Sequence, residues 1–143
     1  MKYNLDQLNE YVEKGLLDRK SHPTLPLFTY KYTRACQYGR LWDDITINMR
    51  GTVIDNEGNL VAATLPKFFN IEEMVNSIPN ESFEVFDKLD GSLIILFNYS
   101  DQWIFASSGS FMSEQAIMAK NISIKYDFKN LDKNLTYLFE IIY

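Results

Sequence analysis

The stretch Phe83-Glu-Val-Phe-Asp-Lys-Leu-Asp-Gly-Ser-Leu-Ile-Ile-Leu-Phe97 decides how this chain is expected to fold. Two apolar runs flank a polar pentapeptide, Lys88-Leu-Asp-Gly-Ser92, whose Asp90-Gly91 pair is a turn signal between strands. The pattern predicts a strand over 83–87, a turn, and a second strand over 93–99. A lysine beside a glycine turn can present its amine to a ligand, because glycine lets another group approach the backbone closely.

The segments on either side of this stretch predict further strands and two helices. Expected strands cover 27–33, 48–54, 60–64, 103–107 and 135–143, and expected helices cover 4–18, capped by Asn4, and 113–120, capped by Ser113. Residues 20–26 are expected to form a loop, residues 55–58 a hairpin turn, and the acidic residues after Phe69 a short helix. The fold class is therefore α+β: mostly antiparallel sheets with flanking helices, in one domain over 1–143.

The composition fits a folded domain and narrows the function. The chain has 143 residues, of which 46% are hydrophobic, and this is enough to bury one core. A net charge of −5 argues against a general electrostatic grip on nucleic acid. Residues 19–50 nevertheless hold six basic side chains against two acidic ones, so a local basic face is expected.

Cysteine and histidine are too scarce for several kinds of site. The single cysteine, Cys36, excludes an internal disulfide and a cysteine-rich metal site, and it fits a reducing, cytoplasmic compartment. A catalytic Cys–His pair is not expected, because His22 is the only histidine and lies in a turn-like stretch. No apolar run approaches 18 residues, which argues against a membrane span.

The Lys88 motif taken alone supports two interpretations: a solvated lysine before a hairpin turn, or a nucleophile. An amine attacks only when neutral, and a partly desolvated, cation-rich pocket would lower its pKa. Other motifs accompany it in a fixed order: Arg50-Gly51, Lys67-Phe-Phe-Asn70, Ser107-Ser-Gly-Ser110 and Phe139-Glu140. Taken singly, Arg50 and Glu140 could be surface residues, and Phe68 and Phe69 would be assigned to the core.

Together these motifs resemble the covalent nucleotidyltransferase superfamily, and above all the phage T4-type RNA ligase 1 family. The resemblance spans nearly the whole chain and implies part of a nucleotidyltransferase (ATP-grasp-like ligase) domain. It makes Lys88 the implied nucleophile that becomes lysyl-AMP. The implied ATP-binding residues are Tyr30, Arg50, Lys67, Asp90, Gly91 and Glu140, with Glu140 also a candidate metal ligand; the implied cofactors are ATP and Mg²⁺.

The chain departs from the family pattern at two places. The family usually has a lysine just before Gly109, where this chain has Ser108, so one phosphate or RNA contact is in doubt. The family's later motifs and its C-terminal specificity domain would follow Tyr143. We therefore expect weak or no self-adenylation and no multiple-turnover joining by this chain alone. We also expect a dimer or a complementing C-terminal segment on the face near 138–143.

The resemblance implies an ATP-dependent RNA ligase of RNA repair. AMP would pass from Lys88 to an RNA 5′-phosphate, and an RNA 3′-hydroxyl would then displace it. A DNA ligase or a capping guanylyltransferase shares the lysine motif, but the Lys-Phe-Phe-Asn element argues against both. The alternative from another class is a pseudo-ligase, a nucleotide- or RNA-binding module without chemistry.

Overall fold

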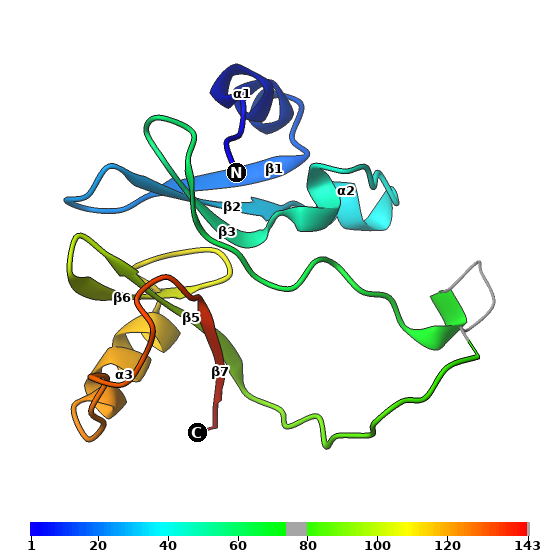
Figure 1. The fold of residues 1–143 in the computed structure, drawn as a ribbon. Coiled ribbons are helices and arrows are strands. Elements are labelled where there is room, and N and C mark those ends of the chain that lie inside the picture. Colours follow the sequence, from blue (N-terminus) through cyan, green and yellow to red (C-terminus); the bar gives the residue numbers. More distant parts are fainter. Residues whose placement is uncertain (74–79, 143) are drawn as a thin grey trace.

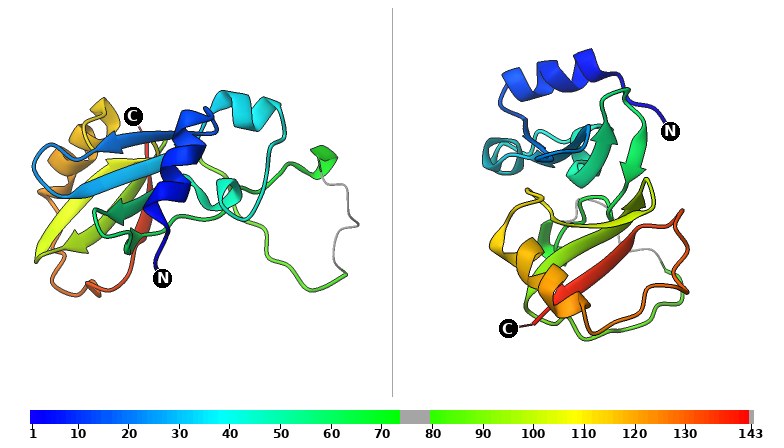
Figure 2. Two further views of the ribbon diagram at one scale, coloured as in Figure 1. Left: turned by 90° about the horizontal axis from the view of Figure 1, so that it is seen from above. Right: turned by 90° about the vertical axis from the view of Figure 1, so that its left-hand side faces the viewer.

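The computed structural model describes residues 1–73 and 80–142. Two of its helices and its two sheets are stacked in four layers, and shorter helices lie in the connections (Figures 1 and 2). Helix α1 (Leu5–Glu13) covers a sheet of order β1-β2-β3-β4, a second sheet of order β6-β5-β7 lies beneath it, and helix α3 (Glu114–Ser123) covers the far side. All pairings within the two sheets are antiparallel. The α+β class and the antiparallel sheets are thus confirmed.

The first sheet consists of β1 (Leu17–Ser21), β2 (Leu27–Tyr32), β3 (Arg50–Asp55) and β4 (Leu60–Ala62). The turn between β3 and β4 forms as expected, because a carboxylate oxygen of Asp55 accepts hydrogen bonds from the backbone N–H groups of Glu57 and Asn59. The short helices α2 (Arg34–Tyr38) and η1 (Thr46–Asn48) lie between β2 and β3.

The second sheet consists of β5 (Ser92–Tyr99), β6 (Gln102–Ser107) and β7 (Tyr137–Ile141). Successive side chains of β5 point to opposite faces of the sheet, as in any strand. Ile95 and Phe97 join Val53 and Leu27 in an apolar cluster between the sheets. A second cluster, which contains Leu8 and Tyr30, fills the space between the first sheet and α1.

The N-terminal helix is shorter than expected, and the strand β1 was missed. α1 ends at Glu13, and Gly15 then adopts a φ of +70°, a conformation that favours glycine. The chain reverses there, and β1 pairs with β2 from Leu17↔Tyr32 to Ser21↔Phe28. Only Leu17 of this strand is buried, so its sequence, Leu-Asp-Arg-Lys-Ser, carries almost no alternating signal.

The strand predicted over 83–87 is wrong, and so is a hairpin turn at Asp90-Gly91. These residues lie in an extended, exposed segment in which Phe83 and Val85 are more than four-fifths exposed. The physical reason is that β5 already has a partner on each edge, β6 and β7, so no edge remains for another strand. The segment returns from a long excursion that follows β4 and includes η2 (Ile71–Glu73) (Figure 1).

The remaining predicted elements are confirmed apart from their ends. Ser113 caps α3 by accepting a hydrogen bond from the Ala116 N–H, and β7 covers the centre of the expected 135–143 strand. The acidic piece after Phe69 is helical at η2, and its continuation over 74–79 lies outside the described residues, as does Tyr143. No helix in the described ranges is both long and apolar enough to cross a membrane.

Candidate functional site

Two of the predicted motifs meet where the sheets face each other. Gly51 has a φ of +103°, and a Cβ there would lie 2.7 Å from the Cα of Ser108 and 2.7 Å from Cδ1 of Ile95. Only glycine fits so close an approach with this backbone conformation. The Arg50-Gly51 element of the first sheet is therefore packed against the Ser107–Ser110 turn of the second.

The strand pairing is irregular beside Arg50. Tyr30 pairs with Thr52 and Lys31 with Arg50, so the register skips Gly51 and β3 contains a bulge at this point. A bulge places two residues opposite one and redirects the side chains beside it, which is a common arrangement next to active sites.

Arg50 and Lys67 each contact one of two consecutive phenylalanines. The Cζ of Arg50 lies 4.6 Å from the ring centroid of Phe68, and the Nζ of Lys67 lies 4.7 Å from that of Phe69. The backbone N–H of Lys67 donates to the carbonyl of Ile47 at 2.7 Å, which fastens this segment to the body of the protein. Assignment of Phe68 to the core is wrong, because its side chain is 57% exposed.

A series of aromatic side chains that no sequence motif marks supports this segment. Phe69 packs edge-on against Trp42 with centroids 5.7 Å apart, and Trp42 packs edge-on against Tyr32 of β2 at 5.0 Å. The available signal was a tryptophan and tyrosines within the basic stretch 19–50. Trp42 thus connects the Lys67–Asn70 motif to the first sheet.

The structure does not bring Lys88 into this group of cations. Its amine is highly exposed, with 81% of the side chain accessible, and lies 3.3 Å from an Oδ1 of Asp90, whose side chain is fully exposed. No contact joins Lys88 to Arg50 or Lys67 in the described part of the chain.

The residues just after Lys88 are held against the last strand. Gly91 lies directly beside the carbonyl oxygen of Ile141, so no larger residue would fit there. Ser92 pairs with Ile141 and Leu93 with Glu140. Asp90-Gly91 and Glu140 therefore lie at the same end of β5 and β7, close enough to contribute to one binding site.

Tyr30, in contrast, is a core residue. Its side chain is 1% exposed and belongs to the cluster beneath α1, together with Leu17 and Met49. Burial raises the pKa of its phenol, although nearby Arg19 opposes the shift. The Tyr30 side chain lies in the cluster beneath α1, whereas Arg50 and Lys67 contact Phe68 and Phe69. A direct contact between Tyr30 and ATP stays a prediction.

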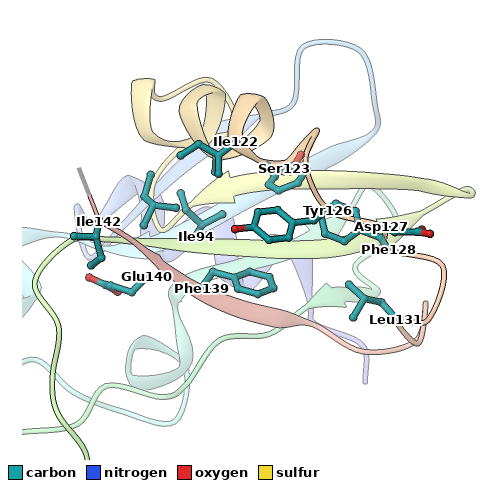
Figure 3. A pocket seen from close by; sticks show the side chains of 13 residues that line it. Ile94, Ile122, Ser123, Tyr126, Asp127, Phe128, Leu131, Phe139, Glu140 and Ile142 are labelled. Atoms are coloured by element: carbon teal, nitrogen blue, oxygen red, sulfur yellow. The ribbon is translucent and has the colours of Figure 1, made fainter.

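A separate apolar pocket of about 560 Å³ lies on the outer face of the second sheet (Figure 3). Ile122 and Tyr126 line it from α3 and the segment that follows, and Ile94, Phe139 and Ile142 line it from the sheet side. Glu140 lies at one end of this pocket, beside Ile142 (Figure 3). The lining is mostly aliphatic and aromatic and offers little to a polyphosphate.

Neither the cysteine nor the histidine forms a reactive pair. The buried Cys36 donates its S–H to the carbonyl of Leu41, while Nδ1 of His22 accepts hydrogen bonds from the N–H groups of Thr24 and Leu25. Within 1–73 and 80–142, no group of three or more His, Cys, Asp or Glu side chains gathers to hold a metal ion.

Comparison with known proteins agrees with the ordered motifs. A family model described as RNA ligase matches residues 48–142. A protein of Autographa californica nuclear polyhedrosis virus, named as a bifunctional polynucleotide kinase/RNA ligase, is 26% identical over 82 residues. That match covers 49% of this chain and 12% of the viral protein, so the chain spans only a small part of this relative's length. Because the family model covers well over half of the residues, this chain belongs to the T4-type RNA ligase 1 family.

Proposed function

We propose that this chain carries the adenylation chemistry of an ATP-dependent RNA ligase, with Lys88 as the nucleophile. The observation that supports it most is the connection of three motifs through Arg50-Gly51: Gly51 packs against Ser108, and the Arg50 guanidinium contacts Phe68, the residue after Lys67. Among the described residues, neither Arg50 nor Lys67 forms an ion pair with a carboxylate, which favours an anionic ligand at this place.

Lys88 would act once its amine is neutral. The Nζ lone pair attacks the α-phosphorus of ATP, a P–N bond forms, the bond to the bridging oxygen breaks, and pyrophosphate leaves. The amine gives up a proton as the phosphoramidate forms. The AMP then passes to an RNA 5′-phosphate, and an RNA 3′-hydroxyl displaces AMP to seal the strand.

The other predicted residues would bind and orient ATP. Arg50 suits a phosphate through its two-pronged guanidinium, and Lys67 suits one as a point charge. Gly91 leaves the backbone open beside the nucleophile. Asp90 and Glu140 supply carboxylates at the same end of β5 and β7.

A divalent ion, Mg²⁺ in our proposal, would supply charge neutralisation for the phosphates. Mg²⁺ is typically held by one or two carboxylates together with substrate phosphates rather than by a full protein cage. Glu140 of β7, with Asp90 just before the adjacent strand β5, fits that requirement.

A second candidate is a nucleotide- or RNA-binding module without chemistry. The exposure of Lys88 favours it, because the side chain lies in solvent beside Asp90 and not in an enclosed site with the other cations. Ligase chemistry would require the segment before β5 to move toward the cations when ATP binds.

Intact-mass spectrometry after long incubation with excess ATP and Mg²⁺ separates the two candidates. The ligase proposal expects a covalent AMP on wild-type protein, mapped to Lys88, and none on Lys88→Ala or Lys88→Arg, since guanidinium stays protonated. Lys129→Ala is the matched control, because Lys129 is 84% exposed and also pairs with an aspartate two residues away. ATP binding without any adduct would establish the binding module instead.

A further inference from the structure

Lys31 of β2 lies beside Gly109 of the second sheet's 107–110 turn, although the resemblance assigns this lysine no role. Its Cδ would lie 3.6 Å from a Cβ added to Gly109. Apart from the residues adjacent to Gly109, it is the one group of the described chain within 4 Å of that position. Gly109 is at the tip of a tight turn in which the Ser107 N–H donates to the Ser110 carbonyl at 2.9 Å.

Lys31 has a cation on one neighbouring strand and a carboxylate on the other. It pairs with Arg50 at the β3 bulge and with Asp18 of β1. Arg50 contacts Phe68, the residue after Lys67. Among the described residues, none of these three cations forms an ion pair with a carboxylate, Asp18 included. The half-buried Lys31 beside Arg50 therefore keeps an amine that an anion could bind.

We propose that Lys31 is a third phosphate-binding residue, which supplies from β2 the positive charge that Ser108 does not supply on the turn. The ligand group is a phosphate, either of the ATP triphosphate or at the 5′ end of RNA. This inference rests on the proposed function for its ligand, and it adds a residue that the ordered motifs do not contain.

The test compares Lys31→Ala with Lys20→Ala, which removes the same charge from an exposed position on the neighbouring strand β1. Loss of a charge-assisted phosphate contact is expected to weaken binding about tenfold. Lys31→Arg should keep most of the affinity. Ser108→Lys added to Lys31→Ala should restore it, because the charge returns to the same place from the other sheet.

Four probes identify the source of the phosphate: ATP with Mg²⁺, inorganic tripolyphosphate, and one RNA oligonucleotide with either a 5′-phosphate or a 5′-hydroxyl. Weaker binding of ATP and tripolyphosphate by Lys31→Ala assigns Lys31 to ATP. Loss of the preference for 5′-phosphate over 5′-hydroxyl RNA assigns it to the RNA end. A melting temperature equal to that of Lys20→Ala shows that the effect is not structural.

The outcomes separate the two proposals. If wild-type protein binds ATP and Lys31→Ala binds every probe as Lys20→Ala does, the role of Lys31 is refuted and the ligase proposal stands. If ATP does not bind but tripolyphosphate binds in a Lys31-dependent way, the ligase proposal fails and the phosphate site stands. If no probe binds, both proposals are wrong.

Discussion

At the scale of single residues, backbone conformation limits which side chains the site can contain. Gly51 combines a positive φ with a close neighbour on the other sheet, whereas Gly15 has a positive φ with nothing within 4 Å of its missing Cβ. An alanine at Gly15 would therefore suffer backbone strain alone, whereas an alanine at Gly51 would suffer both strain and steric overlap.

Gly51→Ala should destabilise the protein more than Gly15→Ala. Strain at a positive φ costs about 1–2 kcal/mol for an alanine, and overlap with a packed neighbour adds about 1–3 kcal/mol. Urea unfolding followed by circular dichroism would measure both variants. Equal losses would contradict the close packing of Gly51 against Ser108.

His22 should make stability fall as the pH is lowered from 7 to 5. Burial, together with nearby Lys120, lowers its pKa from the ordinary value of 6.5, so the unfolded chain takes up a proton before the folded one does. Protonation would also remove the acceptor that Nδ1 offers to Thr24 and Leu25.

His22→Asn, which retains an acceptor but does not titrate, should reduce the change in unfolding free energy between pH 7 and pH 5. Asp43 and Asp55 do not interfere in this range. Their hydrogen bonds outweigh burial and lower the pKa of both carboxyls below the ordinary value of 3.8, so their contribution to stability is lost only at lower pH. Guanidinium denaturation at several pH values would show the difference. Parallel curves for the two proteins would rule out His22 as the cause.

At the scale of elements, Arg50 lies on strand β3 and Lys67 on the segment after β4. Other residues hold these two elements in place. Val53 and Ile54 of β3 are fully buried, while Arg50 at its start contacts Phe68 near the surface. Tyr32, Trp42 and Phe69 form an edge-on aromatic series that connects Lys67 to the first sheet.

Arg50→Ala or Lys67→Ala should weaken ATP binding without unfolding the protein. The expected loss is about 1–3 kcal/mol of binding free energy for a charge-assisted contact, while the melting temperature without ATP should barely change. Isothermal titration calorimetry and thermal melts would measure the two effects. A large fall in melting temperature with unchanged ATP affinity would show that these residues are structural.

At the scale of the whole molecule, the two sheets come from different halves of the chain and share one apolar cluster. Leu27 and Val53 reach this cluster from the first sheet, and Ile95, Phe97 and Ala106 reach it from the second. The long excursion between them leaves the packed body and returns to it (Figures 1 and 2). β7 forms an edge of its sheet, and a dimer or complementing segment at that edge stays a prediction.

Limited trypsin digestion should cut after Lys88 early, because this lysine lies in an exposed segment without secondary structure. The resulting fragments, 1–88 and 89–143, should elute together in native gel filtration, since each supplies one side of the shared cluster, and separate in denaturant. Bound ATP should slow the cut if Lys88 approaches the nucleotide. Immediate separation in native buffer would contradict the packing of the sheets.

The sequence by itself determined the α+β class, most of the strands, α3 with its serine cap, and the family. These depend on local signals: alternating apolar residues, turn residues, and motifs readable in order along the chain. The sequence could not show β1, whose residues are nearly all exposed, nor could it show that 83–87 lacks a partner, because pairing depends on which strands occupy the edges of β5.

Only the tertiary structure decided which motifs lie together. Gly51 against Ser108, Lys31 above Gly109 and Trp42 beneath Phe69 join residues from distant parts of the chain. Such contacts follow from the stacking of one sheet on another and from a bulge beside Arg50, and no local pattern encodes them. For the same reason the sequence could not show that Tyr30, which the resemblance implies as an ATP contact, lies in the cluster between α1 and the first sheet. Its contact with ATP stays a prediction.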